Sequence, residues 1–122
     1  MKIIDIDPEC SLFTQLEQAG DGPVTVINVG VSPEGGQEAC IEAWQKEAAL
    51  MRDQPGFIST QLYTGVGPSR VMTNIAVWES AEALKNALSQ DEWRQGLEMP
   101  PEGTVAYPVL VRKAAVPGIC VA

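Results

Sequence analysis

The stretch Asn74-Ile75-Ala76-Val77-Trp78-Glu79-Ser80 combines a strand pattern with the start of a helix. Successive side chains of a strand point to opposite faces of its sheet, so alternate residues share one environment. One face here carries Met72, Asn74, Ala76 and Trp78, an unusual mixture of apolar and polar groups. An amide, a small residue that leaves space and a ring with an N–H donor are typical of a pocket lined by a sheet. The alternative is that Asn74 is a hydrogen-bonded core amide and Trp78 an ordinary core residue.

The patterns on either side of this stretch predict a larger α+β fold. In chain order they indicate a strand over 24–31, a helix from Ser32 to Pro55, strands over 57–64 and 70–78, a helix from Ser80 and a strand over 104–111. The glycine-rich residues 65–69 join the two middle strands as a hairpin. This order predicts a ferredoxin-like βαββαβ fold with an antiparallel four-stranded sheet. Right-handed crossovers are expected to make the first and third strands central, parallel neighbours.

Each expected helix carries an apolar stripe that faces the sheet. On the first helix the stripe comprises Cys40, Trp44, Ala48 and Met51. On the second it comprises Ala83, Leu84, Ala87 and Leu88, and a further turn capped by Asp91 carries Trp93 and Leu97. The helices therefore cover the sheet face to which Asn28, Asn74 and Trp78 are assigned.

Two flanking segments lie outside the main domain, which is expected to span residues 24–113. Residues 1–23 are expected to form an N-terminal extension with a short helix that starts at Asp7, Pro8 and Glu9. Residues 114–122 form an apolar C-terminal tail. The backbone groups of this tail need hydrogen-bond partners, and a neighbouring subunit is one source of them.

The charge and the histidine content exclude several classes of function. The net charge of −8 argues against binding nucleic acid or anionic lipid, which requires basic patches. An acidic chain with 45% hydrophobic residues fits a protein for small uncharged or apolar ligands. The chain contains no histidine, which excludes Ser-His-Asp and Cys-His catalysis and a haem held by a proximal histidine.

The cysteines and the hydropathy indicate a cytoplasmic protein. Cys10, Cys40 and Cys120 are far apart and odd in number, without disulfide or metal-ligand spacing. Reduced thiols are the state expected in the cytoplasm. We expect no membrane association, because the sequence shows neither a secretory signal nor an apolar run of about 18 residues.

The run Arg52-Asp53-Gln54-Pro55-Gly56-Phe57-Ile58-Ser59, followed by Asn74-x-x-x-Trp78-x-Ser80, resembles the antibiotic biosynthesis monooxygenase family. The resemblance covers roughly residues 24–113. It implies a ferredoxin-like fold and dimers whose sheets meet in an α+β barrel. Several members of this family oxidise aromatic polyketides such as anthrones to quinones with O₂ and no metal, flavin or haem, and others degrade haem.

The resemblance also implies roles for individual residues. Asn74 and Trp78 match a pair that recurs in the quinone-forming members, and Asn28 matches an asparagine of the haem degraders. The helix histidine that holds iron in the haem degraders is missing, which argues against haem degradation. The resemblance thus assigns catalysis to Asn28, Asn74 and Trp78. The walls of the substrate-binding pocket are assigned to Trp44, Met51, Met72, Leu84 and Leu88. Quinone-forming members often carry Tyr and Arg in the helix after the Trp, where this chain has Leu84 and Leu88 instead.

Two functions of different classes stay open. The first is a cofactor-independent monooxygenase for a polycyclic phenol, in which amide and indole N–H donors stabilise the substrate oxyanion. The second is a binding or structural module for an apolar ligand, without turnover. The sequence does not identify a general base. Tyr63 and Tyr107 are candidate proton relays, and Arg52, Arg70 and Arg94 are candidate clamps for an anionic group.

A homodimer is expected on one physical ground besides the resemblance. The sheet face opposite the helices is too apolar to remain in water. It comprises Thr25, Ile27, Val29 and Val31 of one strand and Val71, Thr73, Ile75 and Val77 of another. We expect this face to meet its copy in a closed two-fold dimer.

Overall fold

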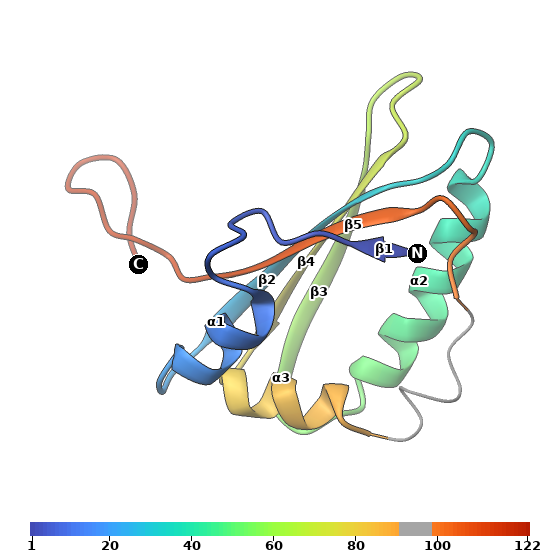
Figure 1. Ribbon diagram of the computed structural model, residues 1–122. Coiled ribbons are helices and arrows are strands. Elements are labelled where there is room, and N and C mark those ends of the chain that lie inside the picture. Colours follow the sequence, from blue (N-terminus) through green and yellow to red (C-terminus); the bar gives the residue numbers. More distant parts are fainter. Residues whose placement is uncertain (91–98) are drawn as a thin grey trace.

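The computed structural model describes residues 1–90 and 99–122 (Figure 1). The elements are β1 (Lys2–Ile3), α1 (Leu12–Gln18), β2 (Val24–Val31), α2 (Gln37–Met51), β3 (Phe57–Thr64), β4 (Val71–Trp78), α3 (Ala81–Leu88) and β5 (Val105–Val111). The strands form one sheet in the order β1-β5-β2-β4-β3. The expected α+β, ferredoxin-like arrangement is confirmed. The expected turn at Asp91 with Trp93 and Leu97, and the candidate Arg94, lie outside the described residues.

The two central strands are neighbours, but they are not parallel as expected. β2 and β4 pair antiparallel, and Asn28 lies directly opposite Asn74. A right-handed crossover through α2 makes β2 and β3 parallel to each other and leaves room for one strand between them. β4 returns from β3 through the hairpin and fills that place, so it runs opposite to both neighbours.

A fifth strand extends the four that the sequence indicated. β1 pairs parallel with β5 at the sheet edge. The Lys2 N–H donates to the Thr104 carbonyl at 2.8 Å, and the Ile4 N–H donates to the Ala106 carbonyl at 2.9 Å. A strand of two residues is too short for its alternation to be recognised in a sequence. The N-terminal segment is therefore part of the sheet as well as carrying a helix.

The first two helices begin later than the sequence suggested. α1 is capped by Ser11, whose hydroxyl accepts from the Thr14 N–H at 3.2 Å, whereas Asp7 belongs to the preceding turn. α2 begins after Gly36, and Ser32 does not cap it. The Ser32 hydroxyl instead donates to the Arg70 carbonyl, and the Arg70 guanidinium donates to the Ser32 carbonyl at 2.8 Å. These bonds hold Ser32 beside the end of β2, four residues before the N-cap position at Gly36.

α3 begins where the sequence predicted. The hydroxyl of Ser80 accepts from the Ala83 N–H at 3.0 Å, which satisfies one of the free donors in the first turn. This cap directs the chain from the end of β4 back across the sheet. The buried side chains of α3 are Ala81, Leu84 and Ala87.

The core lies at the end of the sheet where β4 runs into α3. Trp78 is 2% exposed and packs with Val24, Leu16 and Leu84. The Phe57 ring meets Trp78 edge to face, with centroids 5.4 Å apart. A bulge between Phe57 and Ser59 puts Phe57 opposite Trp78, whereas strict alternation had placed it on the face of Tyr63.

The C-terminal tail satisfies part of its backbone by itself. The backbone N–H groups of Val116 and Cys120 each donate to the other residue's carbonyl at 3.0 Å. Figure 1 shows this turn extending away from the sheet. None of the helices in residues 1–90 and 99–122 is long and apolar enough to cross a membrane.

Candidate active site

A cavity of about 550 Å³ lies between the helices and the sheet face that carries Asn74. All three helices contribute to its wall, as do strands β2 to β5. Pockets for small organic ligands commonly have volumes of about 300–1,000 Å³. The volume therefore falls within the range of small-molecule pockets.

The structure brings all the residues assigned to catalysis or to the substrate-binding walls to this one cavity. Its lining includes Asn28, Trp44, Met51, Met72, Asn74, Trp78, Leu84 and Leu88. Their side chains come from two strands and two helices, and most of them are apolar. Tyr63, Tyr107, Arg52 and Arg70 are not among the lining residues. The cavity is thus an apolar chamber with polar groups placed at a few points.

Asn74 is held in one orientation by a neighbouring strand. The hydroxyl of Thr60 donates to the Asn74 side-chain oxygen, with the two oxygens 2.5 Å apart. The amide NH₂ of Asn74 has no acceptor among the described residues. Because its oxygen is engaged, Asn74 presents N–H donors to the cavity, the polarity that an oxyanion requires.

Asn28 extends the polar patch to the adjacent strand. Residues directly opposite each other in antiparallel strands have side chains about 5 Å apart, so the Asn28 and Asn74 amides are neighbours. The Asn28 side-chain oxygen is buried without a hydrogen-bond partner in the described chain. A buried polar atom without a partner is rare in folded proteins and calls for an explanation by function or by water.

Glu47 is a site residue that the sequence reasoning missed. It lies on α2 between Trp44 and Met51, lines the cavity and is half-buried. Burial raises its pKa from 4.5 to about 7. A signal was present, because counting from Cys40 the cavity-facing stripe falls at i, i+4, i+7, i+8 and i+11, and Glu47 is the i+7 position.

Comparison with known proteins places this geometry in a family. The model of the antibiotic biosynthesis monooxygenase family matches residues 23–99. A proposed monooxygenase from Shewanella loihica is 30% identical, with 80% of this chain and 99% of that one covered and a TM-score of 0.66. The chain belongs to the antibiotic biosynthesis monooxygenase family.

More distant structures share the fold. SnoaB, a cofactor-independent oxygenase from Streptomyces nogalater, is 21% identical, with 80% of this chain and 98% of that one covered and a TM-score of 0.65. A proposed antibiotic biosynthesis monooxygenase from Caulobacter crescentus is 15% identical, with 73% and 89% covered and a TM-score of 0.58. At these identities the likeness concerns the fold. A search of curated proteins gives no match.

Within this family fold, the cavity offers few groups to a metal. The described residues contain no cluster of three or more His, Cys, Asp or Glu side chains that could hold a metal ion. Cys40 lines the cavity, and its sulfur lies 3.4 Å from the Thr104 hydroxyl. The chemistry that these residues can supply is hydrogen bonding by amides and proton transfer by one carboxyl group.

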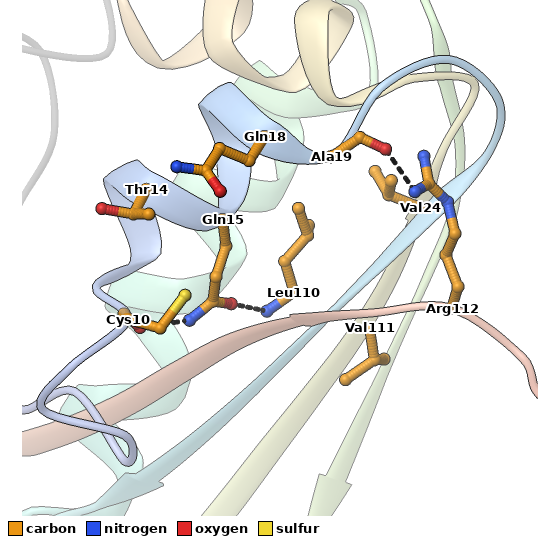
Figure 2. A pocket seen from close by; sticks show the side chains of 9 residues that line it. All are labelled: Cys10, Thr14, Gln15, Gln18, Ala19, Val24, Leu110, Val111 and Arg112. Carbon is orange, nitrogen blue, oxygen red and sulfur yellow. Dashed lines mark hydrogen bonds between the residues drawn. The ribbon is translucent and has the colours of Figure 1, made fainter.

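A second, smaller cavity of about 310 Å³ lies between α1 and β5, and Figure 2 shows its lining. The Gln15 amide donates to the Cys10 carbonyl and accepts from the Leu110 N–H, both at 2.8 Å. The Arg112 guanidinium donates to the carbonyls of Ala19, Pro23 and Asp21. These polar side chains are occupied in holding α1 to β5, so this cavity has the character of a structural junction.

Proposed function

We propose that this family member is a cofactor-independent monooxygenase that oxidises an anthrone-like aromatic or polycyclic phenol to a quinone with O₂. The observation that carries the proposal is the cavity of about 550 Å³ that reaches Asn28, Asn74 and Trp78. If Trp44, Met51, Met72 and Leu84 filled this space, a module without substrate would be favoured. They line the space and leave about 550 Å³ open.

The reaction needs no electron carrier besides the substrate. Loss of a proton from the CH₂ group opposite the ketone of an anthrone gives an anion whose charge is delocalised onto the ketone oxygen. This anion passes one electron to O₂, and the two radicals combine to form a C–O bond. The resulting peroxide loses its second C–H proton as the O–O bond breaks. Overall, CH₂ and O₂ become C=O and H₂O, with one oxygen atom in each product.

The enzyme would accelerate this reaction by stabilising the anion in a dry site. The Asn74 NH₂, fixed by Thr60, donates to the developing oxyanion. Asn28 lies beside Asn74, and the Trp78 indole N–H has no acceptor among the described residues. The apolar walls formed by Trp44, Met51, Met72, Leu84 and Leu88 exclude water, which strengthens these hydrogen bonds.

The proposed working form is a homodimer in the cytoplasm. The outer sheet face carries Ile27, Val29, Ile75 and Val77, and none of the helices in the described residues covers them. A second copy would bury this face. Sedimentation at micromolar concentration is expected to give a dimer, and a monomer would refute this part of the proposal. Three unpaired cysteines are consistent with a reducing compartment.

Oxygen uptake by metal-free protein given a model anthrone tests the function. Wild type is expected to consume O₂ and form quinone well above the uncatalysed rate. Asn74→Ala is expected to lose about 10²- to 10³-fold of kcat, the usual effect of removing one oxyanion donor. Trp78→Phe is expected to reduce kcat while keeping the core filled.

Asn86→Ala is the matched control, since it removes an exposed amide from α3. It is expected to keep the wild-type rate. Uptake by wild type no faster than the background would refute the monooxygenase. The non-catalytic binding module would then be the better interpretation. The purified protein would next be examined for apolar ligands that remain bound through purification.

A further inference from the structure

Glu47 stands out among the groups around the cavity. It is the one carboxylic acid among the described lining residues, and it lies one turn from Trp44 and one turn from Met51. Glu38 and Glu42, on the same helix, are exposed to solvent. A half-buried acid on the apolar stripe is therefore a departure from the pattern of α2.

No hydrogen bond or ion pair to Glu47 occurs within the described parts of the chain. A charged group taken from water without a partner destabilises the folded protein, which makes Glu47 a poor choice for packing alone. Burial raises its pKa to about 7. A base whose pKa lies near neutrality has both a large ionised fraction and a useful affinity for protons at physiological pH.

The surroundings of Glu47 leave its proton free to exchange with a ligand. The other titratable groups among the described lining residues are the thiol of Cys40, also on α2, and the N-terminal amine carried by Met1. The opposite wall presents the neutral side chains of Asn28, Asn74 and Trp78. A ligand in the cavity would thus lie between a carboxylate on the helix and amide donors on the sheet.

We propose that Glu47 is the general base that takes the acidic proton from the bound aromatic substrate. This assignment rests on the proposed function and adds the catalytic group that the family resemblance did not supply. The C–H bonding electrons stay on the substrate, and the resulting oxyanion faces the amides of Asn28 and Asn74. The carboxyl group and the amides act from opposite walls, so the negative charge moves across the cavity with the proton transfer.

The same carboxyl group closes the proton balance. Glu47 takes the first C–H proton and passes it to the distal oxygen of the peroxide. It then takes the second C–H proton as the O–O bond breaks, which leaves hydroxide and the new C=O group. Returning this proton to hydroxide gives water and restores the carboxylate.

Deuterium exchange without oxygen isolates the proposed step. Wild type and Glu47→Gln are incubated anaerobically with anthrone in D₂O, and exchange of the CH₂ protons is followed by NMR. Wild type is expected to accelerate exchange, and Glu47→Gln to lose about 10²- to 10⁴-fold of that acceleration. Glu42→Gln, the same change on the exposed face of α2, is expected to match wild type.

Aerobic turnover of the same proteins separates this proposal from the proposed function. The wild-type kcat is expected to fall as pH drops below the Glu47 pKa. The kcat of Glu47→Gln is expected not to show this fall. Equal exchange and equal turnover in wild type and Glu47→Gln would overturn the base and leave the monooxygenase. Glu47-dependent exchange without O₂ uptake would establish the base and overturn the monooxygenase. Neither exchange nor uptake above background would overturn both.

Discussion

Replacing Glu47 by glutamine is predicted to stabilise the protein, and the gain should depend on pH. Glutamine has nearly the same shape as protonated glutamate but does not ionise. Burial raises the pKa of Glu47 from 4.5 to about 7 because the charged form is poorly solvated beside the cavity. The stabilisation therefore measures the energetic cost of keeping a carboxylate at this position.

The sign and the size follow from proton linkage. Between pH 4.5 and about 7 the folded protein holds a proton on Glu47 that the unfolded chain has released. The free energy of unfolding therefore falls as pH rises through this range, and the loss is complete above it. Raising the pKa to about 7 corresponds to a total of about 3 kcal/mol. Most of this change, about 2 kcal/mol, falls between pH 5 and pH 8.

Urea unfolding at pH 5 and pH 8, at one protein concentration, provides the assay. Glu47→Gln is expected to be more stable than wild type at pH 8, and the difference is expected to shrink by about 2 kcal/mol at pH 5. Glu42→Gln serves as the control, because Glu42 is exposed on the same helix. Its difference from wild type is expected to be close to zero at both pH values.

A stability difference between Glu47→Gln and wild type that is the same at pH 5 and pH 8 would refute this reasoning. Glu47 would then titrate as a solvated carboxyl group, and its place in the cavity wall would not restrict its access to water. A destabilised Glu47→Gln at pH 8 would show instead that the carboxylate has a partner that the glutamine cannot replace.

Three further substitutions test other parts of the site and its support. Thr60→Val removes the hydroxyl that orients Asn74. It is expected to lower kcat about fivefold to tenfold with KM unchanged, because the loss of one hydrogen bond of about 1 kcal/mol corresponds to a change of this size. Thr60→Ser should restore the rate, and failure to do so would contradict a role for the hydroxyl. Gly30→Leu is expected to fold normally, because an added Cβ lies 3.7 Å from its nearest neighbour. Since Gly30 lines the cavity, this substitution is expected to weaken binding of a model anthraquinone more than about tenfold in fluorescence titration. Unchanged affinity would place the ligand elsewhere. Gln15→Ala is expected to cost about 1–3 kcal/mol in urea unfolding by freeing two backbone groups, and a smaller effect would show that water replaces its amide.

The strands and the polar face of β4 could be predicted because their information is local. Alternation along residues 71–78 places Asn74 and Trp78 on one side whatever the rest of the chain does. The family resemblance then identified the first-strand partner, Asn28. The same local reasoning failed for the direction of β2 relative to β4, because strand direction depends on how the whole crossover closes.

The groups that orient and activate the site could not be found in the same way. Thr60 reaches Asn74 diagonally across the hairpin, where Thr60 pairs with Ala76 and Leu62 pairs with Asn74, and a contact between strands leaves no local signal in the sequence. Glu47 lies on a helical stripe, and the burial of that stripe depends on how α2 packs against the sheet. Its periodicity was visible, but the presence of a charge made a solvated position the ordinary interpretation.

The energetic cost of the polar groups favours an enzyme over a passive module. An apolar ligand could be held by the walls of Trp44, Met51 and Leu84 alone. Within residues 1–90 and 99–122, the Asn28 amide oxygen and the Glu47 carboxyl group also have no partner, and each of them lowers stability. Destabilising groups that converge on one cavity from opposite walls are expected where charge must move during a reaction. A carrier gains nothing from a carboxyl group in this wall, whereas an enzyme that deprotonates its ligand needs a base there.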